Sequence, residues 1–176
     1  FGNVESVEFL LKYNCETNEY DAHLVIMEGS ATDIAERAQF NSQITIVVPT
    51  GESFMVTELY MPLQNNQSYD GSVPMKWNLG NPVLAPEAQP ESDFYPLTPA
   101  LAPASFYNNL EEGDEVKLFS FVVGTSGQFD DRVRFFENGV DPKDTDPGMG
   151  GGNYSNGFTL GGASQLYSGS SVESCV

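Results

Sequence analysis

Short segments in which apolar and polar residues alternate follow one another along this chain, with turn-forming residues between them. The clearest is Glu115 to Val123, which reads EVKLFSFVV. A repeat of two residues is typical of a β-strand with one buried face. Only Ser30 to Gln39 has the capping and acidic residues of a helix start, and it predicts one or two turns. The pattern therefore predicts an all-β protein, a two-sheet antiparallel β-sandwich with at most one short helix near 31–39.

Further segments have the composition of strands. They are Val4–Tyr13, Tyr20–Met27, Gln43–Val48, Phe54–Tyr60, Met75–Leu79, Asp93–Leu97 and Asp131–Glu137. The first two are expected to form a hairpin, and Pro49-Thr50-Gly51 predicts a tight turn after the third. Because proline removes a donor from the sheet ladder, the proline-rich stretch 81–103 is expected to supply only short edge pieces.

The length of the chain, 176 residues, fits one domain, so we expect a single domain over 1–176. Its Gly/Ser-rich segment 147–176 should pack on that domain or on a neighbouring subunit. The apolar runs are too short to span a bilayer, so no membrane span is expected. The chain opens at Phe1, and removal of an export signal or excision of a fragment would explain this. Both explanations suit an extracellular or cell-surface protein.

The charge is strongly acidic, with 25 Asp and Glu against 7 Lys and Arg. Such a chain repels phosphate backbones and anionic headgroups, so nucleic acid is excluded as the expected partner. Divalent cations or neighbours that present cations fit this charge better.

The only cysteines, Cys15 and Cys175, lie near opposite ends of the chain. Their spacing fits neither a zinc knuckle nor a CxxC redox pair. An intramolecular disulfide is the leading interpretation, and it would tie the C-terminal segment to an early strand. A pair of free thiols and an intermolecular bond are the alternatives.

A cluster of carboxylates at Asp141, Asp144 and Asp146, on a loop with proline and glycine, is a candidate calcium site. Calcium prefers several oxygen ligands on a tight loop. The spacing departs from the EF-hand pattern, and no Glu stands at the twelfth position. The alternative interpretation is a solvated turn that binds no metal, and no other cofactor is expected.

Catalytic chemistry has little support in the sequence, and we expect no enzyme activity. His23 is the only histidine, and its place on a strand favours a solvated side chain. Aromatic residues offer another interpretation, a platform on which sugar rings stack, with Trp77 and Tyr95 as its main members; the alternative is packing in the core. The full aromatic set is Tyr60, Tyr69, Trp77, Phe94, Tyr95 and Tyr107.

Several motifs together resemble secreted bacterial cell-surface modules of the cohesin-like β-sandwich type. They are the strand and PTG unit at 43–51, the acidic Gly-Asp turn at 111–114, EVKLFSF at 115–121, and a late DP loop that runs into a Gly-rich tail with a terminal cysteine. The resemblance implies a two-sheet, jelly-roll-like module exported to the cell surface, and it carries over no catalytic residues. The proline-rich middle of this chain departs from the pattern.

These observations lead us to expect an extracellular structural or adhesive protein. It would be a self-assembling subunit of a surface filament or layer, or a module of a surface adhesin, and its partners would be copies of itself or other surface proteins. The alternative is a carbohydrate-binding module that contacts polysaccharide. A secreted hydrolase is a third, weaker candidate, since paired carboxylates carry no specificity in so acidic a chain.

Overall fold

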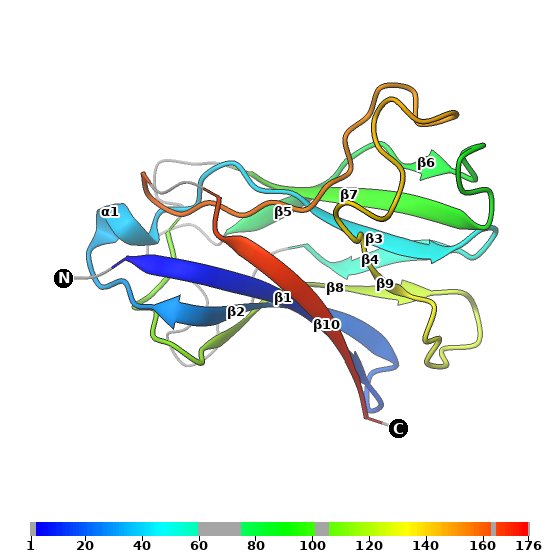
Figure 1. Cartoon of the computed structure of the whole chain (residues 1–176). Helices are drawn as coiled ribbons and strands as arrows, with labels where there is room; N and C mark the ends of the chain where they lie inside the picture. Colours follow the sequence, from blue (N-terminus) through cyan, green and yellow to red (C-terminus); the bar gives the residue numbers. More distant parts are fainter. Residues whose placement is uncertain (1–2, 60–74, 101–105, 163–164, 176) are drawn as a thin grey trace.

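Two β-sheets pack face to face in the computed structural model, which describes residues 3–59, 75–100, 106–162 and 165–175 (Figure 1). The strands are β1 (Val4–Asn14), β2 (Glu19–Gly29), β3 (Ile44–Pro49), β4 (Phe54–Glu58), β5 (Lys76–Leu79), β6 (Val83–Leu84), β7 (Ser92–Ala100), β8 (Glu115–Val123), β9 (Arg134–Phe135) and β10 (Tyr167–Ser174). A single short helix, α1 (Ile34–Arg37), is found among these residues. The predicted all-β sandwich with one short helix is confirmed.

The first sheet has the strand order β10-β1-β2-β8-β4, and the second has the order β5-β7-β3-β9, with β6 paired to β7. All pairings are antiparallel except one, because β10 runs parallel to β1. The expectation of wholly antiparallel sheets is therefore wrong at this edge. A parallel pair needs a long crossover, and here the crossover is nearly the whole chain.

The predicted hairpin and turn are both present. β1 and β2 pair along their length, and the turn between them is closed by the Asn18 amide, which donates to the Asn14 carbonyl at 2.8 Å. After β3, Gly51 adopts a φ of +87°, the left-handed region that glycine enters without steric cost. The PTG sequence thereby turns the chain toward β4.

Aromatic pairs join the sheets across the core. Phe9 of β1 packs against Phe135 of β9 with ring centroids 5.7 Å apart. The ring centroids of Trp77 in β5 and Phe119 in β8 lie 5.9 Å apart. Both members of each pair are almost wholly buried. Rings of this size bury a large apolar area, so these contacts contribute much of the stabilisation between the sheets.

The strand β7 corrects the expectation that the proline-rich stretch forms only edge pieces. It lies between β5 and β3 and contains Pro96 and Pro99. β3 pairs with residues 92–97 and β5 pairs with residues 97–100, so each proline has a ladder on only one side. A missing N–H therefore need not leave an unpaired acceptor in a neighbouring strand.

The C-terminal segment folds back onto the domain as β10, a strand that the sequence pattern did not predict. A disulfide joins Cys15, just after β1, to Cys175, just after β10, so the predicted intramolecular bridge is confirmed.

The described residues contain no helix that is long and apolar enough to cross a membrane.

Candidate functional site

The carboxylate of Asp141 is the centre of a hydrogen-bonded junction. The Arg134 guanidinium donates to both of its oxygens, at 2.7 and 2.8 Å, and the Glu137 amide donates to one of them at 2.7 Å. Gln89 donates at 3.2 Å from a separate turn. Asp141 is only 5% exposed. Burial raises the pKa of Asp141, but the hydrogen bonds from Arg134, Glu137 and Gln89 and the charge of Arg134 together outweigh it and leave this pKa below its ordinary value.

The other predicted calcium ligands lie apart from this junction. Asp146 accepts a hydrogen bond from the Lys143 amide at 2.8 Å and so closes a local turn, and Asp144 is exposed. Groups of three or more His, Cys, Asp or Glu side chains arranged for a metal are not found among the described residues. Asp141 thus has a guanidinium as its cation, and calcium binding at this loop stays a prediction.

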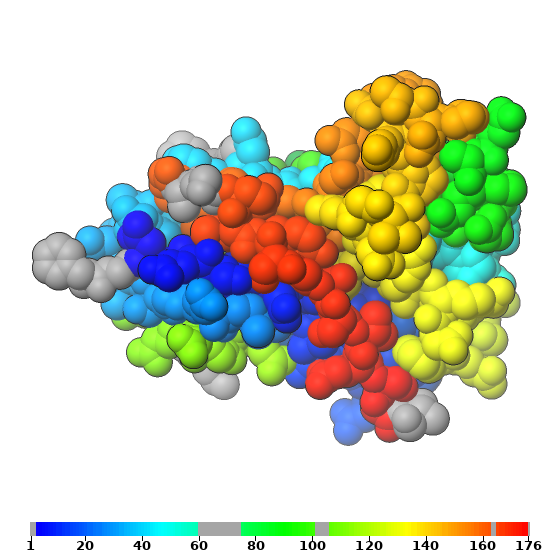
Figure 2. Space-filling view, viewed as in Figure 1, coloured from blue at the N-terminus to red at the C-terminus, as the bar shows by residue number. Residues whose placement is uncertain are grey.

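The junction places a long loop beside the second sheet. Figure 2 shows residues 138–156, coloured yellow to orange, standing out next to the green turn that follows β6. The Ala88 amide of that turn donates to the Pro147 carbonyl at 2.8 Å. Phe136 and Tyr154 pack against Phe94 on the outer face of β7, which covers this part of the sheet.

The aromatic residues proposed for sugar stacking do not form an exposed platform in the described chain. Trp77, Phe94 and Tyr107 are 0% exposed, so the core interpretation is correct for all three. Tyr95 is half-buried, and one face of its ring stacks on Phe54 with centroids 4.1 Å apart. Tyr60 and Tyr69 lie outside the described residues. The burial of Trp77 corrects its assignment as a sugar-stacking ring.

A belt of charged side chains crosses the outer face of the first sheet, and the sequence analysis did not identify it. Its members are Lys12, Asp21, Glu58, Glu115, Lys117 and Glu173. Lys12 lies 2.6 Å from Glu115, and Lys117 lies 3.0 Å from Glu58. A register shift between Val56 and Glu58 sets Glu58 opposite Ser120. The pairing of β2 with β1 and β8, and of β1 with β10, makes the other members neighbours.

His23 lies within this charged belt, opposite Lys117 in the ladder. Its side chain is partly buried, so the solvated histidine expected from the sequence is exposed to solvent only in part. Burial lowers the pKa of His23, and the charge of Lys12 lowers it further. The Asp21 carbonyl lies 3.2 Å from its Nδ1. Neutral imidazole is therefore the form that the folded protein favours near neutral pH.

An uncharged groove of about 650 Å³ lies beside the second sheet. We call it the amide groove, and its polar lining includes Asn41, Ser42, Gln43, Asn153, Ser155 and Gln165. None of its described lining residues is charged, although the protein has a net charge of −18. Amide and hydroxyl groups can both donate and accept hydrogen bonds. The groove therefore suits a neutral polar ligand better than an ion.

The walls of the amide groove are held by side-chain amides. Gln43 donates to the carbonyls of Asn153 and Ser155, both at 2.9 Å. Asn156 is 5% exposed, accepts from the Thr45 amide at 2.8 Å and donates to the Phe136 carbonyl at 2.7 Å. A site whose walls are fixed in this way is pre-formed, as ligand sites usually are.

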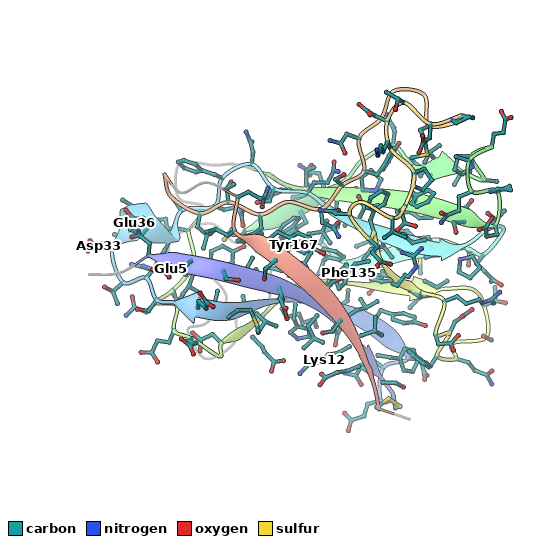
Figure 3. All side chains as sticks on the ribbon, in the orientation of Figure 1. Glu5, Lys12, Asp33, Glu36, Phe135 and Tyr167 are labelled. Carbon is teal, nitrogen blue, oxygen red and sulfur yellow. A yellow bond between two sulfur atoms is a disulfide. The ribbon has the colours of Figure 1, made fainter. Side chains whose placement is uncertain are left out.

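A second groove, of about 450 Å³, follows the seam between β9 and β10. We call it the β10 groove. Its lining comes from Arg134, Phe135, Glu137, Asn138 and residues 167–172. Phe135 and Tyr167 mark this seam in Figure 3. The outer edge of β10, which is unpaired among the described strands, borders this groove.

The sequence contained a partial signal for the amide groove. The segments Asn41-Ser42-Gln43 and Asn153 to Asn156 are both rich in amides and hydroxyls, but they lie more than a hundred positions apart. Backbone bridges between residues 43 and 157 bring them together.

Comparison with protein-family models, with curated proteins and with solved structures found no match to this chain.

Proposed function

We propose that this protein is an extracellular structural or adhesive module that joins copies of itself edge to edge into a cell-surface filament or layer. The observation that carries the proposal is the outer edge of β10, which pairs with no other described strand. Native edge strands are normally blunted by proline, charge or bulges. β10 contains no proline and one charged residue, Glu173, and its pairing with β1 is regular beyond Gly169.

The first sheet has a second edge, β4, on its opposite side. Pairing of β10 in one copy with β4 in the next would continue the sheet from molecule to molecule. Such a head-to-tail contact does not close on itself unless its rotation forms a ring, so it builds filaments. The β10 groove leaves room for the side chains of an added strand beside that edge.

The disulfide supports an extracellular location, because such bonds persist in oxidising compartments. The likeness to cohesin-like surface modules belongs to the same proposal, and the two-sheet architecture is the one that this likeness implies.

Proline substitutions in β10 test the assembly. N–H groups of a strand alternate between its two edges, so of Ser170→Pro and Ser171→Pro one removes a donor from the open edge and the other removes a donor facing β1. We expect the variant that loses the donor at the open edge to form no long particles in electron micrographs and to keep the Tm of the wild type. We expect the variant that loses the donor facing β1 to have a lower Tm. A wild-type protein that stays monomeric at high concentration, or filaments that persist in both variants, would contradict the proposal.

A carbohydrate-binding function is the second candidate, and the amide groove is the observation that favours it. We expect Asn41→Ala and Thr98→Val, which change exposed side chains of this groove, to weaken retention in gels that contain a neutral polysaccharide. Asn109→Ala changes an exposed amide outside the groove and is the matched control. Equal retention of all three variants and the wild type would remove this candidate.

A further inference from the structure

We propose that this domain is a load-bearing link in which tension between its two ends bypasses the fold. The covalent path from the start of β1 to the end of β10 runs along β1, crosses the Cys15–Cys175 disulfide and leaves the domain. The disulfide joins residues 160 positions apart, so nearly all of the chain forms a closed loop off this path. The inference does not depend on edge-to-edge assembly.

The part of the chain that carries the load is already extended. β1 contains 11 residues, and at about 3.3 Å per residue it spans about 36 Å. A fully extended chain reaches at most about 3.6 Å per residue, so β1 could lengthen by only about 4 Å. Tension along this path therefore cannot lengthen the molecule appreciably, even if β1 leaves the sheet.

The position of the disulfide makes this path as short as the strand itself. Cys15 follows β1 directly, and Cys175 follows β10 directly, with the two Cα atoms 6.0 Å apart. In Figure 3, Glu5 and Lys12 mark the two ends of β1, and β10 runs alongside to finish near Lys12. A disulfide closing a loop elsewhere would stabilise the fold, but it would leave more chain in the path.

Loss of the disulfide would move the load onto the contacts between β1 and β10. The two strands are parallel and would be pulled from opposite ends, so the hydrogen bonds between them would be loaded together in shear. Further support comes from Tyr167, whose ring packs 4.6 Å from Phe9, and from Ser168, which donates to the Val7 carbonyl. When these contacts fail, the released chain could extend by roughly 500 Å.

Single-molecule force spectroscopy on the full chain, held through handle domains at both ends, tests the inference. We expect the oxidised protein to show no step longer than about 10 Å before the handles unfold, and the protein treated with reductant to show a step of roughly 500 Å. The double variant Cys15→Ser/Cys175→Ser should behave like the reduced protein. If it does not fold, reduction of the wild type held at low force gives the same comparison.

A different attachment point is the matched control. Moving one handle from the C-terminus to the exposed position Asp144 places the chain between Asp144 and Cys175 in the load path. The oxidised protein should then show a step of roughly 100 Å. A step of several hundred ångströms in the oxidised protein pulled from its ends, with no free thiol detectable, would overturn the proposal. So would the absence of any long step after reduction.

Discussion

Single side chains help to organise the loop that follows β9. Asp141 accepts hydrogen bonds from β9, from its own loop and from the turn after β6. A buried carboxylate in this position depends on its partner, because removal of the partner leaves an uncompensated charge. The ion pair of Asp141 with Arg134 therefore helps to hold the loop over the second sheet.

Arg134→Met tests this dependence. We expect it to lower the free energy of unfolding by about 2–3 kcal/mol, less than for a fully buried pair because the side chain of Arg134 is 34% exposed. The matched control is Arg132→Met, which removes an ion pair with Asp130 in which the Arg132 side chain is 68% exposed. Denaturation in urea should show little change for the control. Equal losses in both variants would contradict the role given to Asp141.

The histidine in the charged belt predicts a pH dependence. The pKa of His23 in the folded protein lies below its ordinary value of 6.5, so below that pH the unfolded chain binds a proton more readily than the folded protein does. Stability contributed by neutral His23 is present above pH 6.5 and is lost as the pH falls toward the folded value.

His23→Gln should remove this part of the pH dependence. We expect the wild type to lose stability more steeply than the variant between about pH 7 and about pH 5, before most carboxylates titrate. Urea denaturation at several pH values measures the difference. Parallel curves for the two proteins would show that the histidine is not responsible.

At the scale of elements, side chains near each strand end decide how far the ladders run. The expected strand Asp131–Glu137 is reduced to β9, two residues long. Before it, Asp130 accepts hydrogen bonds from the amide and guanidinium of Arg132, and after it Asp141 captures the Glu137 amide. Such local hydrogen bonds compete with those of the sheet ladder. The alternation of apolar and polar residues gives no sign of this competition.

Only Tyr167 and Val172 of β10 belong to the residue types that favour strands, so we expect this strand to depend on its disulfide. The double variant Cys15→Ser/Cys175→Ser should lose up to about 5 kcal/mol of stability in the chain-entropy model, since the bond closes a loop of 160 positions. The rate of hydrogen exchange should increase most, relative to the oxidised wild type, at the amides of residues 170–174. If exchange there matches that of the oxidised protein, the pairing with β1 is sufficient without the bond.

At the scale of the whole molecule, the large negative net charge affects the stability of the folded state. If all 7 Lys and Arg pair with carboxylates, 18 of the 25 carboxylates are still unmatched, so the folded state is destabilised by self-repulsion. We expect Tm to rise as NaCl increases from about 10 mM to about 500 mM, because screening weakens this repulsion.

Calcium chloride at the same ionic strength separates screening from specific binding. A calcium site would raise Tm beyond the effect of NaCl, and chelation would reverse the gain. Asp144→Asn should abolish such a gain if the predicted site exists. Equal effects of both salts would show that the loop 141–146 is a turn and no metal site.

Local sequence determined the class of the protein and most of its strands. Alternation in β1, β2 and β8 is sufficient to predict them, because each strand has one face in the core and long segments of period two have few other solutions. The cysteines likewise allowed the bridge to be predicted, with free thiols and an intermolecular bond as the alternatives. The existence of these strands was thus accessible from local pattern.

Tertiary structure alone decided which distant residues meet. The partner of Asp141, the burial of Trp77, the amide groove and the parallel pairing of β10 with β1 all depend on contacts between residues far apart in sequence. Local pattern carries no information on such contacts, since the same carboxylate can bind calcium, water or an arginine according to what the fold brings to it. The weak strand former β10 is the clearest case, because only the neighbouring β1 and the disulfide make it a strand.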